Sequence, residues 1–241
     1  MDLPSYPFLN AQWRNLVMVN YEVEPALLVD RVPAGTTLDF WHGKTYVSLV
    51  GFQFREAKVL GAPVPFHQDF EEVNLRFYVR RVVAEEVRSA VVFIREVVPR
   101  QLVGGMARLL YREPYVVVPM ASEVTGAPPG PPLVRYAWHL DGRWQSVGGR
   151  ADGAGAPPAP RTHEEFIAIR HWGYNGKPGS DTLEYRVEHP RWTVWAARDV
   201  RVEADLTALC GLELARHLTT PATALIADGS TVTVHWRTRV S

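Results

Sequence analysis

Residues 70–81, FEEVNLRFYVRR, constrain the fold more than any other segment, because hydrophobic and polar residues alternate along them. A period of two is that of a β-strand, in which successive side chains point to opposite faces. From residue 72 to residue 79 one face carries only hydrophobic side chains, and the other carries Glu72, Asn74, Arg76 and Tyr78. The alternation therefore predicts a strand with two chemically different faces.

Most of the remaining chain also has the β-branched and aromatic composition of strands. Such segments are residues 15–24, 37–60, 88–99, 114–125, 133–147, 183–204 and 230–240. The dipeptide Asp141-Gly142 predicts a tight hairpin. Proline and glycine predict a connection over residues 61–66 and two loops, at residues 125–132 and 148–160.

Few segments have the pattern of a helix. The predicted helices are residues 26–32, residues 101–113, a short segment that follows Thr162, and residues 205–218. Thr162 and Glu165 have the spacing of a capping box, and Asp205 is a suitable N-cap for the last helix.

Many short strands with few helices predict an α+β, mainly β fold rather than a doubly wound α/β sheet. We expect a β-barrel with an internal cavity and a few outer helices, because closure of the sheet removes exposed edges. No repeat or linker separates parts that could fold alone, so a single domain is expected over residues 1–241.

Composition narrows the classes of partner. The chain has 26 basic and 26 acidic residues, which argues against a broad surface for nucleic acid or anionic membranes. Cys210 is the only cysteine and is expected to be a buried helix residue. Dinucleotide, P-loop and zinc-protease motifs are absent, so we expect no cofactor and no metal. Without an N-terminal signal sequence or a long apolar segment, a cytoplasmic protein is expected.

The polar face of residues 70–81 has two interpretations. In the first it is the solvent-exposed face of a half-buried strand, which is the common antiparallel case. In the second it lines the lumen of the barrel, with Glu72 and Arg76 as its charged centre. These two residues are four apart, about 13 Å along a strand that rises ~3.3 Å per residue, so they need not pair with each other. The mixture of carboxylate, amide, guanidinium and phenol favours a lumen that holds a ligand.

Aromatic and histidine side chains flank the predicted strand and recur elsewhere. His67 lies beside Phe66, Trp13 precedes the first strand-like segment, and the run HWGY contains Trp172 and Tyr174. Each of them is a candidate for ordinary aromatic packing. As a group they are candidates for contacts with the ligand at the cavity mouth.

The segments PFLNAQWRNLVMVNYEV, VPAGTTLDFWHGKTYVSLVGF, VPFHQDFEEVNLRFYVRR, FIREVVPR and HWGY with LEYRVEHPRW resemble the YqjF-like family of uncharacterised proteins. That family belongs to the acetoacetate decarboxylase-like superfamily. The resemblance covers nearly the whole chain and implies a barrel-like fold with an internal cavity. It also implies that Glu72 corresponds to a glutamate that such enzymes place in the cavity.

The resemblance also implies a departure from acetoacetate decarboxylase chemistry. In those enzymes a lysine forms an imine with the keto acid, and Arg100 lies at about the matching position here. Arginine stays protonated and forms no Schiff base. The chain's three lysines, Lys44, Lys58 and Lys177, lie in other segments.

These observations lead to three hypotheses. In the first, an enzyme acts on a carboxylate- or carbonyl-bearing small molecule: Arg76 anchors the anion, Glu72 acts as acid or base, and Asn74 and Tyr78 orient the ligand. In the second, the same cavity belongs to a non-catalytic binding or sensing module. In the third, the protein is a structural homo-oligomer whose barrel is filled, with Glu72 and Arg76 in buried ion pairs.

Overall fold

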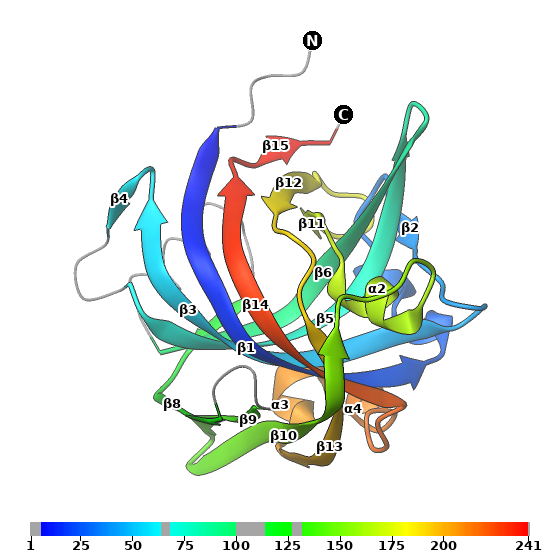
Figure 1. Ribbon diagram of the computed structural model, residues 1–241. Coiled ribbons are helices and arrows are strands. Elements are labelled where there is room, and N and C mark those ends of the chain that lie inside the picture. Colours follow the sequence, from blue (N-terminus) through cyan, green and yellow to red (C-terminus); the bar gives the residue numbers. More distant parts are fainter. Residues whose placement is uncertain (1–5, 64–67, 100–113, 127–131, 241) are drawn as a thin grey trace.

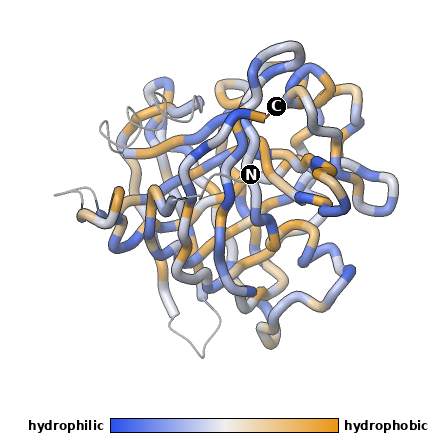
Figure 2. The backbone as a smooth tube through the Cα atoms, turned by 90° about the horizontal axis from the view of Figure 1, so that it is seen from above, coloured by the Kyte–Doolittle hydropathy of each residue, from blue (hydrophilic) through white to orange (hydrophobic). Residues whose placement is uncertain are grey.

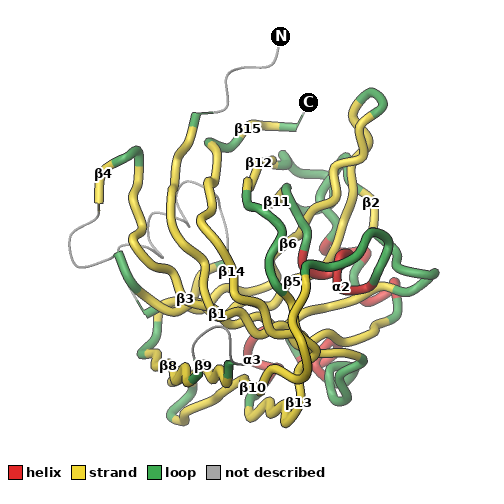
Figure 3. Tube along the Cα trace, viewed as in Figure 1, coloured by secondary structure: helices red, strands yellow, loops and turns green. Residues whose placement is uncertain are grey.

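The structure is a computed structural model that describes residues 6–63, 68–99, 114–126 and 132–240. Figure 1 shows a strongly curved sheet with short helices beside it. The strands are β1 (Pro7–Val23), β2 (Thr37–Leu38), β3 (Thr45–Val59), β4 (Ala62–Pro63), β5 (Phe70–Val83), β6 (Glu86–Val98), β7 (Tyr115–Val117), β8 (Met120–Thr125), β9 (Leu133–Leu140), β10 (Arg143–Ala156), β11 (Trp172–Asn175), β12 (Leu183–Glu188), β13 (Val194–Glu203), β14 (Thr223–His235) and β15 (Thr238–Arg239). The helical elements are η1 (Pro25–Leu27), η2 (Val29–Arg31), α2 (His163–Ala168), α3 (Leu206–Cys210) and α4 (Leu212–Ala215). Figure 3 shows how far strands outweigh helices, which confirms the mainly β fold.

The sheet closes into a ring. Strands β12, β11, β6, β5, β3, β1 and β14 follow one another as hydrogen-bonded neighbours. Strand β12 also pairs with β14, through Val187 with Val234 and Glu188 with Thr233. Beyond the ring the sheet continues from β14 through β13, β10 and β9 to β8. The ring gives β5 an inner face and an outer face, and the extension lies near the outer one.

Two hydrophobic cores lie on the two sides of β5. The hydrophobic face of this strand is fully buried in a core that includes Tyr136 and Trp138 of β9 and the apolar residues of α3 and α4. Tyr78, on the opposite face, belongs to a second core inside the ring, with Met18 and Phe52. Both faces of β5 therefore lie inside the protein, and Figure 2 shows hydrophobic and hydrophilic residues alternating along the strands.

The helices are shorter than the sequence predicts. Residues 26–32 form two separate 3-10 turns, η1 and η2, instead of one helix. Residues 205–218 form α3 and α4, which are interrupted at Gly211, where φ is +86°. Asp205 caps α3 as predicted, by accepting a hydrogen bond from the Thr207 amide. Cys210 is buried, and burial raises the pKa of its thiol to about 11.

The loop predicted over residues 148–160 is wrong for residues 148–156, because β10 continues to Ala156. The small residues of this segment favour a loop by composition, but they also allow close packing. A Cβ atom on Gly155 would lie 2.2 Å from the indole of Trp195, so glycine lets that ring lie against the strand. The predicted hairpin at Asp141-Gly142 is confirmed: both residues have positive φ and join β9 to β10.

Two further predictions fall on parts of the chain outside the described residues. They are the helix at residues 101–113 and most of the loop at residues 125–132. Among the described residues, no helix combines the length and the apolar character needed to cross a bilayer.

Candidate functional site

The polar face of β5 is buried. Glu72, Asn74, Arg76 and Tyr78 expose 3%, 2%, 8% and 1% of their surface. The solvent-exposed interpretation of this face is therefore excluded. The alternation along the strand instead separates a hydrophobic core outside the ring from a more polar interior.

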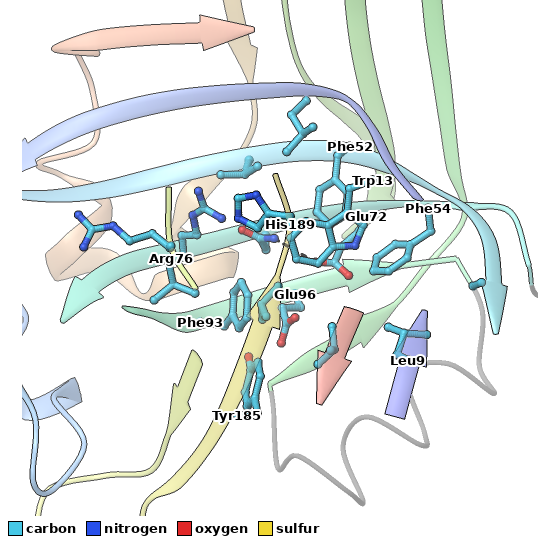
Figure 4. Close-up of a pocket in the computed structure, with 18 of the residues that line it drawn as sticks. Leu9, Trp13, Phe52, Phe54, Glu72, Arg76, Phe93, Glu96, Tyr185 and His189 are labelled. Carbon is cyan, nitrogen blue, oxygen red and sulfur yellow. Dashed lines mark hydrogen bonds between the residues drawn. The ribbon is translucent and has the colours of Figure 1, made fainter. Parts of the chain in front are cut away.

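A pocket of about 150 Å³ lies inside the ring. All the ring strands contribute to its lining, together with the segment that follows α2 and the turn after β12. Figure 4 shows Arg76 at one end of the labelled side chains and Leu9 and Phe54 at the other, with Phe93 and Tyr185 between them. The polar side chains of the described lining are Glu72, Asn74, Arg76, Glu96, Arg170 and His189, and tyrosine and tryptophan side chains also contribute.

Arg76 is a buried cation that lacks a carboxylate partner among the described residues. Its Nη2 donates to the backbone oxygen of Ile167 at 3.3 Å and lies 3.9 Å from the sulfur of Met18. Its Nε is buried and has no hydrogen-bond partner among the described residues. A buried charge without a counter-ion is costly, so this guanidinium is suited to an anion that enters the pocket.

Arg170 is a second buried guanidinium on the same pocket, and it is ion-paired. Its Nη1 lies 2.5 Å from Oδ2 of Asp39, and its Nε donates to the backbone oxygen of Phe166 at 2.6 Å. The guanidinium also lies over the ring of Tyr78, 4.9 Å from the ring centroid. Since Asp39 neutralises Arg170, the two arginines differ in their capacity to bind a ligand anion.

Glu72 and Asn74 form a pair on the pocket wall. Asn74 Nδ2 donates to Oε1 of Glu72 at 2.9 Å. The other amide atom, Oδ1 of Asn74, is buried without a hydrogen-bond partner among the described residues. Glu96 of β6 is the cross-strand neighbour of Asn74 and adds a second carboxylate to the lining.

Tyr78 belongs to the predicted row but does not line the pocket. Its hydroxyl lies 2.6 Å from the hydroxyl of Ser48, and its ring packs on Phe166 of α2, with the centroids 5.1 Å apart. Helix α2 thus covers this end of the row, and Tyr78 holds the helix in place rather than meeting a ligand.

Trp13 and Trp172 line the pocket, as the sequence analysis proposes. The ring of Trp13 meets those of Phe52, Phe54 and Trp192 at steep angles, with centroids 5.3, 6.0 and 6.4 Å away. Its Nε1 is buried without a hydrogen-bond partner among the described residues. Trp172 stacks with Arg88, whose guanidinium lies 4.1 Å from the ring centroid.

Tyr174 lies away from the pocket although it is close to Trp172 in sequence. Its hydroxyl donates to Oε2 of Glu184 at 2.5 Å, and Arg81 and Arg88 bind the same carboxylate. Burial and this hydrogen bond raise the pKa of Tyr174. The remaining predicted site residues, His67 and Arg100, lie outside the described residues.

Glu96, Arg170 and His189 also line the pocket, although the sequence patterns did not point to them. His189 lies beside Pro190, and its Nδ1 lies 2.9 Å from the Pro190 backbone oxygen. Its ring stacks on Trp192, and burial is the main cause of its lowered pKa. Arg170 and His189 are about a hundred residues from β5, so no local pattern in the sequence connects them with it. Glu96 follows Arg95 in a strand-like run, but only the pairing of β5 with β6 brings it beside Asn74.

The three lysines of the chain all fall in described segments, and all three are exposed. Lys44 forms an ion pair with Glu22, and none of the three lines the pocket. In the described part of the chain, no cluster of three histidine, cysteine, aspartate or glutamate side chains is arranged to hold a metal ion.

The fold is that of the acetoacetate decarboxylase-like proteins. An acetoacetate decarboxylase-like enzyme from Sphingomonas wittichii RW1 superposes with a TM-score of 0.67 at 13% identity, over 98% of this chain and 94% of that one. Acetoacetate decarboxylase from Legionella pneumophila gives a TM-score of 0.67 at 10% identity, over 99% and 88%. The enduracididine biosynthesis enzyme MppR gives 0.65 at 13% identity, over 99% and 89%. At these identities the likeness establishes the fold alone.

Within that fold class, the chain belongs to the DUF2071 family of uncharacterized conserved proteins, whose pattern matches residues 10–231. It is also similar to the uncharacterized protein YqjF of Bacillus subtilis (strain 168), with 26% identity over 115 residues. The matched segment covers 47% of this chain and 46% of YqjF. The family resemblance read from the sequence is thereby confirmed.

Proposed function

We propose that the protein binds a small carboxylate-bearing molecule in the pocket and acts on it as an enzyme without a Schiff-base lysine. The observation that carries the proposal is the state of Arg76, which is 8% exposed, lines the pocket and has no ion pair among the described residues. A guanidinium binds a carboxylate through two parallel charge-assisted hydrogen bonds. Arg76 Nε, which has no hydrogen-bond partner among the described residues, supplies a donor for such a contact.

The other polar groups of the lining support a reaction at the bound molecule. Glu72 is the proposed acid or base, because a buried carboxylate on the same strand face as Arg76 can exchange a proton with the ligand. Asn74 holds Glu72 Oε1 through its amide nitrogen. Its Oδ1 has no hydrogen-bond partner in the described part of the chain and can accept from a hydroxyl or amine of the ligand. An imine mechanism is not part of the proposal, since the pocket has no lysine in its described lining.

The binding step is tested with Arg76→Met and a panel of small carboxylic acids, by isothermal titration calorimetry. Removing one partner of a buried charge pair costs about 2 kcal/mol or more, so affinity is expected to fall roughly 30-fold or further. The matched control is Arg55→Met, because Arg55 is an exposed arginine on the neighbouring strand β3. Equal affinities for wild type and Arg76→Met would overturn the proposal.

The catalytic step is tested with Glu72→Gln, which keeps an oxygen that can accept the hydrogen bond from Asn74. If Glu72 transfers a proton, turnover is lost while ligand affinity is retained. Loss of affinity without any product from the wild type would instead favour the non-catalytic binding module. Borohydride treatment in the presence of a 2-keto acid is expected to leave all three lysines unmodified by mass spectrometry.

A further inference from the structure

We propose that the ligand is a monocarboxylic acid with an apolar body about the size of one six-membered ring, such as an aryl acid. The inference rests on the proposed function, since it assigns a ligand class to the same pocket. It concerns the part of the ligand that lies beyond the carboxylate. Small polar keto acids would leave that part of the pocket unfilled.

The chemistry of the lining supports an apolar body. Apart from the six polar side chains named above, every described lining residue is aliphatic or aromatic. Trp13, Phe52 and Phe54 form a cluster of rings in mutual contact. Aromatic rings favour edge-to-face or offset contacts with another ring at such distances, so this cluster can accept one more ring.

Arg76 and the ring cluster of Trp13, Phe52 and Phe54 lie apart in the pocket, and Glu72 lies beside that cluster as the cross-strand neighbour of Phe52. In Figure 4 Arg76 lies at one end of the labelled side chains, while Phe54 and Leu9 lie at the other. A ligand whose carboxylate meets Arg76 therefore extends its body toward Phe93, Phe52 and Trp13. Burying that body among rings is favourable in proportion to its apolar area.

The volume limits the size of the body. About 150 Å³ is the size of an apolar cavity known to hold benzene in another protein. A single ring therefore fits, while a long alkyl chain exceeds the space.

The charges limit the number of carboxylates. Beyond Arg76, the other cation of the described lining is Arg170, which is neutralised by Asp39. A second carboxylate on the ligand would be buried without a counter-ion at the described lining, which is costly. Dicarboxylates are therefore disfavoured.

The experiment measures affinities for matched acids by calorimetry: acetate against phenylacetate, pyruvate against phenylpyruvate, and phenylacetate against dodecanoate and glutarate. We expect each phenyl acid to bind at least tenfold more tightly than its methyl counterpart, and dodecanoate and glutarate to bind more weakly than phenylacetate. Benzyl alcohol, which has the ring without the charge, is expected to bind at least tenfold more weakly than phenylacetate.

Two variants change the apolar part of the lining without changing Arg76 itself. Ala57→Leu adds volume at a buried lining position and is expected to weaken phenylacetate binding at least tenfold more than acetate binding. Phe93→Ala enlarges the pocket and is expected to improve the affinity for naphthylacetate relative to phenylacetate. The second variant keeps the test decisive if the first one does not fold.

The outcomes separate this inference from the proposed function. Acetate and pyruvate binding as tightly as the phenyl acids, with affinities that depend on Arg76, would overturn the inference and leave the proposed function standing. Binding of the acids that Arg76→Met does not weaken, or no binding of any acid, would overturn both.

Discussion

At the scale of single residues, the two buried arginines of the pocket show what distinguishes a binding group from a structural one. Arg170 has its carboxylate, Asp39, within the protein, whereas Arg76 faces the pocket without one among the described residues. The sequence predicted Arg76, because it lies in an alternating strand. It could not predict Arg170, since the ion pair joins residues that are 131 positions apart.

This difference predicts opposite effects on stability. Arg76→Met replaces a buried charge that has no ion pair with any described residue by a hydrophobic side chain, and it is expected to leave the free energy of unfolding unchanged or higher. Arg170→Met leaves Asp39 without its partner and is expected to cost roughly 3–5 kcal/mol. Guanidinium denaturation of both variants without ligand measures the two effects. A large loss of stability in Arg76→Met would show that Arg76 has a structural role instead.

The pKa of the His189 imidazole is expected to depend on Arg76. Its pKa is lowered mainly by burial, and the positive charge of Arg76 contributes. Both Arg76→Met and the binding of a carboxylate at Arg76 are therefore expected to raise the pKa of His189. A titration followed by NMR of the imidazole signals measures it. His163 is the internal control, because its pKa is lowered by burial and no effect of Arg76 contributes.

At the scale of elements, the stability of helix α2 is expected to affect the shape of the pocket. Thr162 caps this six-residue helix by accepting a hydrogen bond from the Glu165 amide, as the sequence predicted. The backbone oxygen of Ile167, inside the helix, accepts a hydrogen bond from Arg76. Arg170 follows the helix directly. The sequence pattern therefore gave the start of α2, while its contact with β5 depends on the closure of the ring.

Thr162→Ala tests this connection. Loss of an N-cap hydrogen bond costs about 1 kcal/mol, and carboxylate affinity is expected to fall as well because the helix orients Arg76. Chemical denaturation and calorimetry measure the two quantities. Thr207→Ala, an exposed threonine in α3 far from the pocket, is the control and is expected to change neither. Unchanged affinity in a destabilised Thr162→Ala protein would contradict the orienting role.

At the scale of the whole molecule, closure of the sheet determines those parts of the structure that sequence patterns did not predict. Alternation and turn signals predict most strands and the mainly β class, because these depend on neighbouring residues. The parts of the pocket that come from β12 and the segment after α2 depend on pairing between distant segments, such as Val187 with Val234. The strand character of residues 148–156 was likewise hidden, since it comes from pairing with β13, which is far away in sequence.

Two partly buried histidines, His163 and His189, make the fold sensitive to acid. Burial lowers the pKa of His163 and His189 in the folded protein. As the pH falls below about 6.5, the unfolded chain binds protons at these positions that the folded chain does not, so the free energy of unfolding decreases. Guanidinium denaturation at pH 8, 6.5 and 5 measures this decrease. The double variant His163→Gln/His189→Gln is expected to reduce it, and an unaltered dependence would assign the effect to other groups.

Strand β5 contributes to two regions of the protein, because its side chains alternate between the outer core and the pocket. Substitutions at even-numbered positions 72–76 can thus change ligand preference while the intervening valine, leucine and phenylalanine continue to support the fold. A family built on this arrangement is free to diversify in chemistry at every second residue without redesigning its interior.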